Sequence, residues 1–112
     1  MSPAERYTAI VKAFVGKRGV SAESGRGFGS SALKIDNRIF AMLASGDRFV
    51  VKLPRARVDA MVAAGDGERF DPRRNGKLMK EWLVVGRRLE ARWLPLAQEA
   101  FEFAQIKRPK RA

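Results

Sequence analysis

The chain has 112 residues, of which 46% are hydrophobic and 31% are charged, and this length and composition fit one domain with its own apolar core. It contains no Cys and no His, which excludes disulfide bonds, thiolate metal sites and histidine-based catalysis. The 23 Lys and Arg residues exceed the 12 Asp and Glu residues and give a net charge of +11. A field of this sign would attract polyanions such as nucleic acid or an anionic membrane, and a simple solubility bias explains the excess equally well.

A first helix is predicted over residues 3–15, because one apolar stripe recurs at helical spacing: Tyr7, Ile10, Val11 and Phe14. Ser2 can cap this helix, and Pro3 suits its first position. The stretch 21–31 is rich in Gly and Ser and is predicted to be a loop, or a loop leading into a strand. Its glycines could approach a phosphate, but their spacing fits neither a dinucleotide-binding motif nor a P-loop, and no strand is predicted before them.

Three short strands are predicted next, over residues 32–36, 39–43 and 48–53, because apolar and polar residues alternate between turn signals. A second helix begins at Pro54 and ends at Gly65, with Val58, Met61 and Val62 on its buried face. Residues 66–79 are mostly turn-like and contain one apolar anchor, Phe70. A fourth strand over 81–85 and a last helix over 89–106 complete the predicted elements.

The predicted order is therefore α-β-β-β-α-β-α. Because the strands do not alternate with helices, the pattern predicts an α+β fold: an antiparallel meander with helices packed on one face. Residues 1–106 form the single domain, and residues 107–112 are expected to be a disordered basic tail. Four of the positive charges lie in this tail, so the rest of the chain keeps a net charge of +7.

Two cationic segments are candidates for phosphate contacts. Turn-borne Lys and Arg can reach phosphates without reading bases, and the candidates in the loop at 71–80 and in the tail are Arg73, Arg74, Lys77, Lys80, Lys107, Arg108, Lys110 and Arg111. An ordinary solvated loop is the simpler interpretation of the first segment. Phe28, Phe40 and Phe49 lie on or next to predicted strands and could stack bases, but core packing explains the aromatic residues better.

No catalytic arrangement is predicted. The serines have no histidine to activate them and no Ser-x-x-Lys spacing. Asp66, Glu68 and Asp71 lie close together in the sequence, but in a basic segment without an apolar pocket, so they are interpreted as surface charges. We therefore expect no enzyme activity, no cofactor and no metal site.

Three stretches together carry a family resemblance: 37–43 (NRIFAML), 50–54 (VVKLP), and 65–70 (GDGERF) followed by Met79-Lys80-Glu81-Trp82. Over roughly residues 4–104 the chain resembles the N-terminal domain of the TfoX/Sxy family of bacterial competence regulators, whose broader relatives are the YjbR/MmcQ-like small proteins. The resemblance implies an α+β fold and a regulatory role, and the YjbR-like relatives are loosely described as DNA-binding. The full-length TfoX proteins also carry a helix-hairpin-helix-like C-terminal domain that is absent from this sequence, so a competence role is not implied.

Two functions are consistent with these observations. The first is a small non-enzymatic regulatory domain that binds nucleic acid mainly through phosphates. The second is a protein-interaction adaptor that uses its sheet face and binds no nucleic acid. The opening residues lack an export signal, and no apolar run is long enough to span a membrane, so we expect a soluble cytoplasmic protein without a membrane partner. The sequence sets no oligomeric state.

Overall fold

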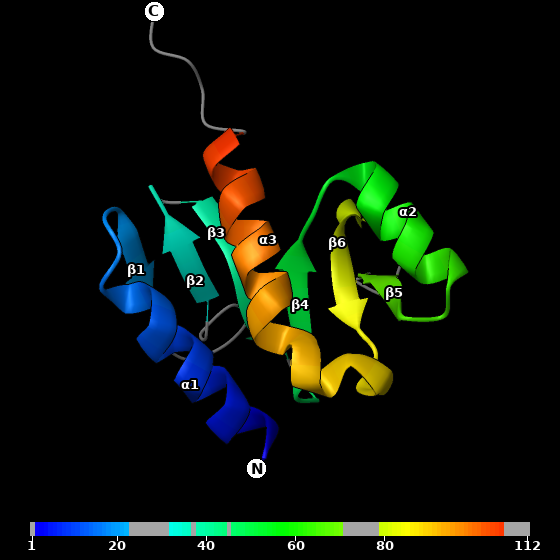
Figure 1. Ribbon diagram of the computed structural model, residues 1–112, viewed down its shortest axis with the longest axis horizontal. Helices are drawn as coiled ribbons and strands as arrows, with labels where there is room; N and C mark the ends of the chain where they lie inside the picture. The colour runs from blue at the N-terminus through cyan, green and yellow to red at the C-terminus, as the bar shows by residue number, and fades with distance from the viewer. Residues whose placement is uncertain (1, 23–31, 37, 45, 71–78, 107–112) are drawn as a thin grey trace, which may run out of the picture.

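The computed structural model describes residues 2–22, 32–36, 38–44, 46–70 and 79–106. Three α-helices, one 3-10 helix and six strands lie in these ranges (Figure 1). In chain order they are α1 (Pro3–Val15), β1 (Val20–Ala22), β2 (Ala32–Ile35), β3 (Arg38–Ala44), β4 (Arg48–Lys52), α2 (Arg55–Ala63), β5 (Gly67–Phe70), β6 (Met79–Val85), η1 (Arg87–Arg92) and α3 (Trp93–Ile106).

The six strands form one antiparallel sheet in the order β1-β2-β3-β4-β6-β5. Strands β1 to β4 follow one another as a meander, and β6 then adds to β4, leaving β5 at the edge (Figure 1). The α+β prediction of an antiparallel sheet with packed helices is confirmed. A bulge separates Leu33 from Lys34 in the pairing of β2 with β3.

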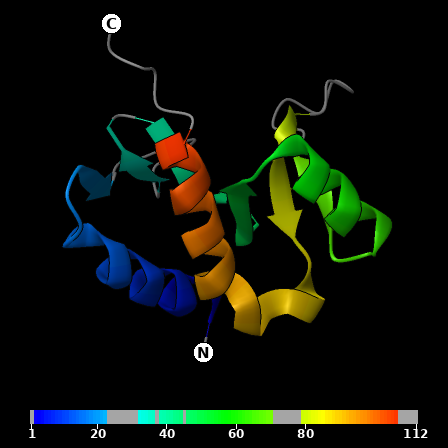
Figure 2. The same cartoon turned by 45° about the horizontal axis from the view of Figure 1, so that its top comes forward.

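The helices pack on one face of the sheet and build the main core (Figures 1 and 2). The rings of Phe14 on α1, Phe40 on β3 and Phe101 on α3 lie 5.4–5.5 Å apart between centroids. Phe49 of β4 stacks on Trp93 of α3 with 4.6 Å between ring centroids. Aromatic side chains from helices and strands therefore join the two layers, and each buries a large apolar area.

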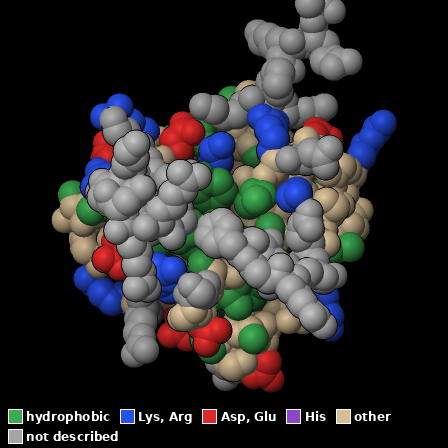
Figure 3. Space-filling view, turned by 180° about the vertical axis from the view of Figure 1, so that it is seen from behind, with side chains coloured by type: hydrophobic (Ala, Val, Ile, Leu, Met, Phe, Trp, Pro, Cys, Tyr) green, Lys and Arg blue, Asp and Glu red, His purple; other side chains and the backbone are tan. Residues whose placement is uncertain are grey.

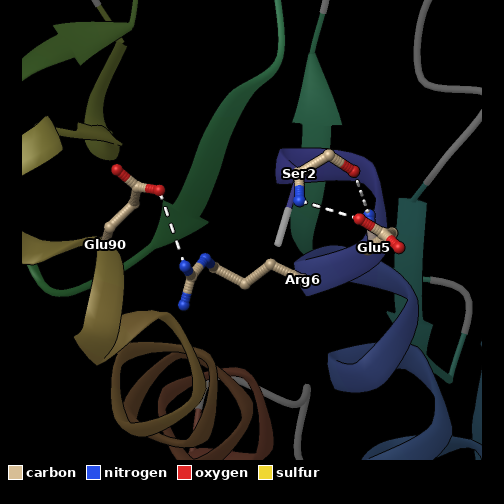
Figure 4. A network of polar contacts seen from close by, with 4 residues as sticks. All are labelled: Ser2, Glu5, Arg6 and Glu90. Carbon is tan, nitrogen blue, oxygen red and sulfur yellow. Dashed lines mark hydrogen bonds and ion pairs between the residues drawn. The ribbon is translucent and has the colours of Figure 1, made fainter.

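The start of α1 has the predicted cap (Figure 4). The hydroxyl of Ser2 accepts a hydrogen bond from the Glu5 backbone N–H at 3.1 Å, and the Ser2 N–H donates to the Glu5 carboxylate at 2.9 Å. The bond from the Ser2 backbone N–H favours the charged carboxylate and lowers the pKa of Glu5 from its ordinary value, and the Ser2 side chain adds to this effect. The next residue, Arg6, forms an ion pair with Glu90 of η1 at 3.5 Å, which connects α1 to η1 (Figure 4).

Two strands were not predicted, and both lie at sheet edges. Ser21 and Ala22 belong to β1 rather than to a loop, so a strand does precede the glycine-rich stretch. Gly67–Phe70, predicted as turn-like, forms β5 and pairs with β6. Both strands are three or four residues long, which is too short for alternation to be visible, and hydrogen bonds to a neighbouring strand stabilise them instead.

The other helices and strands begin or end within a few residues of their predicted bounds. The fourth predicted strand begins at Met79 rather than at residue 81. The last predicted helix is divided: residues 87–92 form η1, with non-helical backbone at Leu89, and α3 begins at Trp93. Pro95 consequently lies in the first turn of α3, where its missing N–H costs no hydrogen bond.

Candidate functional site

The sheet has a second apolar cluster on the face opposite the helices. Within the described residues, strand side chains alone form this cluster: Ala32, Met42, Ala44, Val50, Phe70 and Val84, with Ile39 and Trp82 packed against it. We call this side of the sheet the second face. Figure 3 views the molecule from this side, and hydrophobic side chains gather in its middle.

Strand register places three cations and one carboxylate on the second face. Lys34 lies opposite Ile39, Arg48 opposite Ala44, and Lys52 opposite Trp82; residues paired across antiparallel strands share a face. Glu68 lies opposite Val84 and is the one acidic side chain among the described strand positions of this face. The charge that the described strands add to the second face is therefore mainly positive.

Two of these cations lie over aromatic rings. The Lys52 ammonium is 5.7 Å from the centroid of the Trp82 ring, and the Arg48 guanidinium carbon is 5.6 Å from that of Phe70. Lys52 and Trp82 are both half-buried, so each residue keeps part of its surface accessible to solvent. An exposed cation–π contact contributes about 0.5–1 kcal/mol. This contact positions Lys52 weakly, and the flexible side chain can leave the ring when a stronger anionic partner arrives.

Several cations on the helical side make hydrogen bonds or ion pairs that connect elements of the fold. Arg57 of α2 donates to Glu99 of α3 at 3.1 and 3.2 Å, and this hydrogen bonding raises the pKa of Arg57. Arg69 pairs with Asp59, joining β5 to α2. Arg38 donates to the backbone carbonyl of Ala104 at 2.5 Å, near the end of α3, where a cation also interacts favourably with the helix dipole. Within the described residues, Lys52 makes no such ion pair.

Of the eight cations proposed from the sequence as phosphate contacts, the structure describes only the backbone of Lys80. Lys80 lies in β6, the strand that also carries Trp82, but its side chain is outside the described part of the structure. The other seven, Arg73, Arg74, Lys77, Lys107, Arg108, Lys110 and Arg111, are outside the described residues.

The aromatic platform considered from the sequence does not form. Phe40 and Phe49 have 0% of their surface exposed and lie in the core under the helices, because the bulge in the β2–β3 pairing and the strand alternation turn both rings to that side. Phe28 is outside the described residues. The aromatic residue on the second face that remains accessible is Trp82, which sequence patterns assigned to the core. The signal that could have found this face is the i, i+2, i+4 series Arg48, Val50 and Lys52.

A second polar feature lies between α1 and α3. The Arg6 guanidinium carbon is 5.8 Å from the Trp93 ring centroid, and the Arg6 Nε and Trp93 Nε1 atoms are buried without a hydrogen-bond acceptor among the described residues. Both side chains belong to the packing of α1 against η1 and α3, with Glu90 as the partner of Arg6 (Figure 4). This arrangement stabilises the packing of α1 against η1 and α3, and we assign it a structural role.

Side chains suited to metal binding do not cluster in the described part of the chain. No cluster of three His, Cys, Asp or Glu side chains that could hold a metal occurs among those residues. Asp66 uses its backbone carbonyl to accept the Gly86 N–H at 2.8 Å, and Glu68 is exposed on β5. Asp71 lies outside the described residues.

Comparison with known proteins gives no relative for this chain: no family model, no curated protein and no solved structure matches it. None of the helices in the described ranges combines the length and the apolar character needed to cross a membrane. The functional inference therefore depends on the second face and on the overall charge.

Proposed function

We propose that this protein is a small non-enzymatic binding domain that associates with nucleic acid, mainly through phosphate contacts. The observation that carries the proposal is the second face, where, among the described strand positions, Lys34, Arg48 and Lys52 outnumber one carboxylate, that of Glu68. The net charge of +11 supports it, because a field of this sign draws polyanions from a distance.

Phosphate contacts of this kind give affinity without sequence discrimination. Lys and Arg neutralise phosphates and release counterions, which makes the affinity fall as salt rises. The cations at 73–80 and in 107–111 are part of the proposed contact set, since loops and terminal arms commonly add such contacts. A cytoplasmic regulatory role, and membership of the group that the TfoX N-terminal domain represents, belong to the same proposal and are supported by the sequence resemblance.

The test is binding of fluorescently labelled oligonucleotides, single-stranded and duplex, measured by polarisation from low to physiological salt. The proposal expects log affinity to fall linearly with log salt, with a slope of about −0.9 per contacted phosphate on duplex and about −0.7 on single strands. Oligonucleotides of different sequence should bind alike. The absence of binding to both forms at low salt, where electrostatic attraction is strongest, would contradict the proposal.

A protein-interaction adaptor is the second candidate, and one observation favours it. Strand β1 is at the edge of the sheet, and its Ser21 and Ala22 are exposed. An exposed edge can accept a strand from another chain. This function requires affinity that persists at high salt and depends on backbone pairing. Because hydrogen-bonded pairs alternate along β1 and β2, the Ala22 N–H faces away from β2, so Ala22→Pro would weaken the adaptor and leave the electrostatic binding of nucleic acid unchanged.

A further inference from the structure

The second face carries an aromatic ring together with cations. A surface of this kind can distinguish single-stranded from duplex nucleic acid. Trp82 lies on β6 directly opposite Lys52 of β4, and both are half-buried. Strand β4 lies between β3 and β6 in the order of the sheet, so this pair is away from its edges. Accessible tryptophan and lysine are thus presented side by side from neighbouring inner strands.

In a duplex the flat faces of the bases are stacked on one another, and a protein side chain reaches only phosphates and base edges. A single strand exposes the faces of its bases as well, and these faces stack on aromatic side chains regardless of sequence. We propose that the second face binds single-stranded nucleic acid, with a base stacked on Trp82 and the neighbouring phosphates bound by Lys52 and Arg48. This inference rests on the proposed nucleic-acid function and specifies its ligand.

The contact between Lys52 and Trp82 does not prevent stacking. Release of an exposed cation–π contact lowers affinity by about two- to fivefold. One stacked base raises affinity by about five- to a hundredfold, and the released ammonium gains a phosphate. Its stem is flexible, so the ammonium can move from the ring to the phosphate while the backbone of β4 stays in place.

Tryptophan fluorescence gives a direct readout, because the chain has only two tryptophans and Trp93 is buried, with 5% of its surface exposed. In the Trp93→Phe variant, Trp82 is the sole source of tryptophan emission. Titration with oligo-dT of about 12 nucleotides, within the length that single-strand-binding domains cover, should quench this emission to saturation. A duplex of the same length should bind with little quenching. Unchanged emission at saturating oligo-dT would overturn the inference.

Affinity variants complete the test, each checked for a cooperative thermal transition. Trp82→Leu keeps the apolar contacts with the second cluster and removes the stacking surface, so single-strand affinity should fall by about fivefold or more while duplex affinity stays unchanged. Trp82→Phe, which retains a ring, should recover most of the loss. Equal losses for both nucleic acids, or none in a folded Trp82→Leu protein, would contradict base stacking while leaving phosphate-based binding intact.

A last comparison separates stacking from charge alone. Polyglutamate of matched length carries a similar number of negative charges and no bases. It should bind the protein more weakly than oligo-dT at the same salt and should leave Trp82 emission unchanged. Equal binding and equal quenching by polyglutamate would assign the face to acidic polypeptides instead, and failure of every polyanion to bind would overturn both this inference and the proposed function.

Discussion

Tyr7 is the chain's single tyrosine, and its ring lies against Phe49 in the core, with 6.0 Å between the ring centroids. Its burial was predicted from the helical stripe that it shares with Phe14, because a period of 3.6 residues identifies the inward side of a helix. Strand residues were harder to assign. Phe49 and Trp82 are both aromatic residues in apolar strands, yet they lie on opposite faces of the sheet, and composition alone does not say which face the helices cover.

The buried hydroxyl of Tyr7 has a measurable consequence at alkaline pH. Burial raises the pKa of Tyr7 above its ordinary value of 10.0, because the charged phenolate loses its hydration. The unfolded chain ionises first, so the contribution of Tyr7 to stability is complete below about pH 10 and is lost as the pH rises beyond it. A titration of tyrosinate absorbance should show no midpoint near 10 while the far-ultraviolet circular dichroism remains native.

The control for this titration is Tyr7→Phe, which should lose less stability between neutral and alkaline pH than the parent protein does. Equal alkaline losses in the two proteins, or a phenolate that forms at its ordinary pKa in the folded state, would place the hydroxyl in solvent.

Phe101 tests the assignment of the core. Its ring contacts those of Phe14 and Phe40, and 7% of its surface is exposed. Phe101→Ala should therefore lower the free energy of unfolding by about 3–5 kcal/mol, as in other cores that lose an aromatic ring. Denaturant unfolding measures the change, and Phe103, which is only partly buried, provides the comparison: Phe103→Ala should cost less. A loss below about 1 kcal/mol for Phe101 would mean that α3 packs through another side.

At the scale of elements, the long periodic segments were predictable and the short ones were not. The helix over 3–15 was predicted with its observed bounds because it carries a capping residue, an N-terminal proline and an apolar stripe. Strand β5 has no such signature. Its position depends on Gly67, where an added Cβ would lie 2.4 Å from the Val84 carbonyl oxygen and 3.0 Å from a Leu83 methyl. This close approach of two backbones comes from tertiary pairing, which no local pattern reports.

Substitution at Gly67 should therefore weaken the pairing of β5 with β6. Gly67→Ala forces the two backbones apart and should reduce the free energy of unfolding by about 1–3 kcal/mol or more, as overpacking does elsewhere. Gly16, at the end of α1, has nothing within 4 Å of an added Cβ and a negative φ of −78°. Gly16→Ala should consequently leave stability nearly unchanged or raise it slightly. Similar unfolding midpoints for both variants in thermal and denaturant melts would contradict the observed β5–β6 pairing.

At the scale of the whole molecule, the sequence predicted the fold class, since runs of strands and helices that do not alternate favour an antiparallel sheet with packed helices. It did not predict the second face. The candidate cations were chosen where they cluster along the chain, in the segments 73–80 and 107–111, whereas Lys34, Arg48 and Lys52 share one face of the sheet through the alternation and register of its strands. Arg48 and Lys52 share this face because side chains alternate along β4, whereas Lys34 joins them only through the pairing of β2, β3 and β4, which no local pattern reports.

The measurement that tests the central claim most directly compares two double variants that remove the same charge. Arg48→Gln with Lys52→Gln removes two cations from the second face. Arg55→Gln with Lys12→Gln removes two from exposed positions on α2 and α1, so the net charge falls equally from +11 to +9 in both proteins. Nucleic-acid affinity is measured by polarisation over a range of salt concentrations. The account predicts that the second-face variant binds more weakly and that its slope against log salt is reduced by up to about two contacts, whereas the helical variant keeps the parent slope. Equal losses in the two variants would show that net charge alone sets binding and would contradict a binding site on the second face.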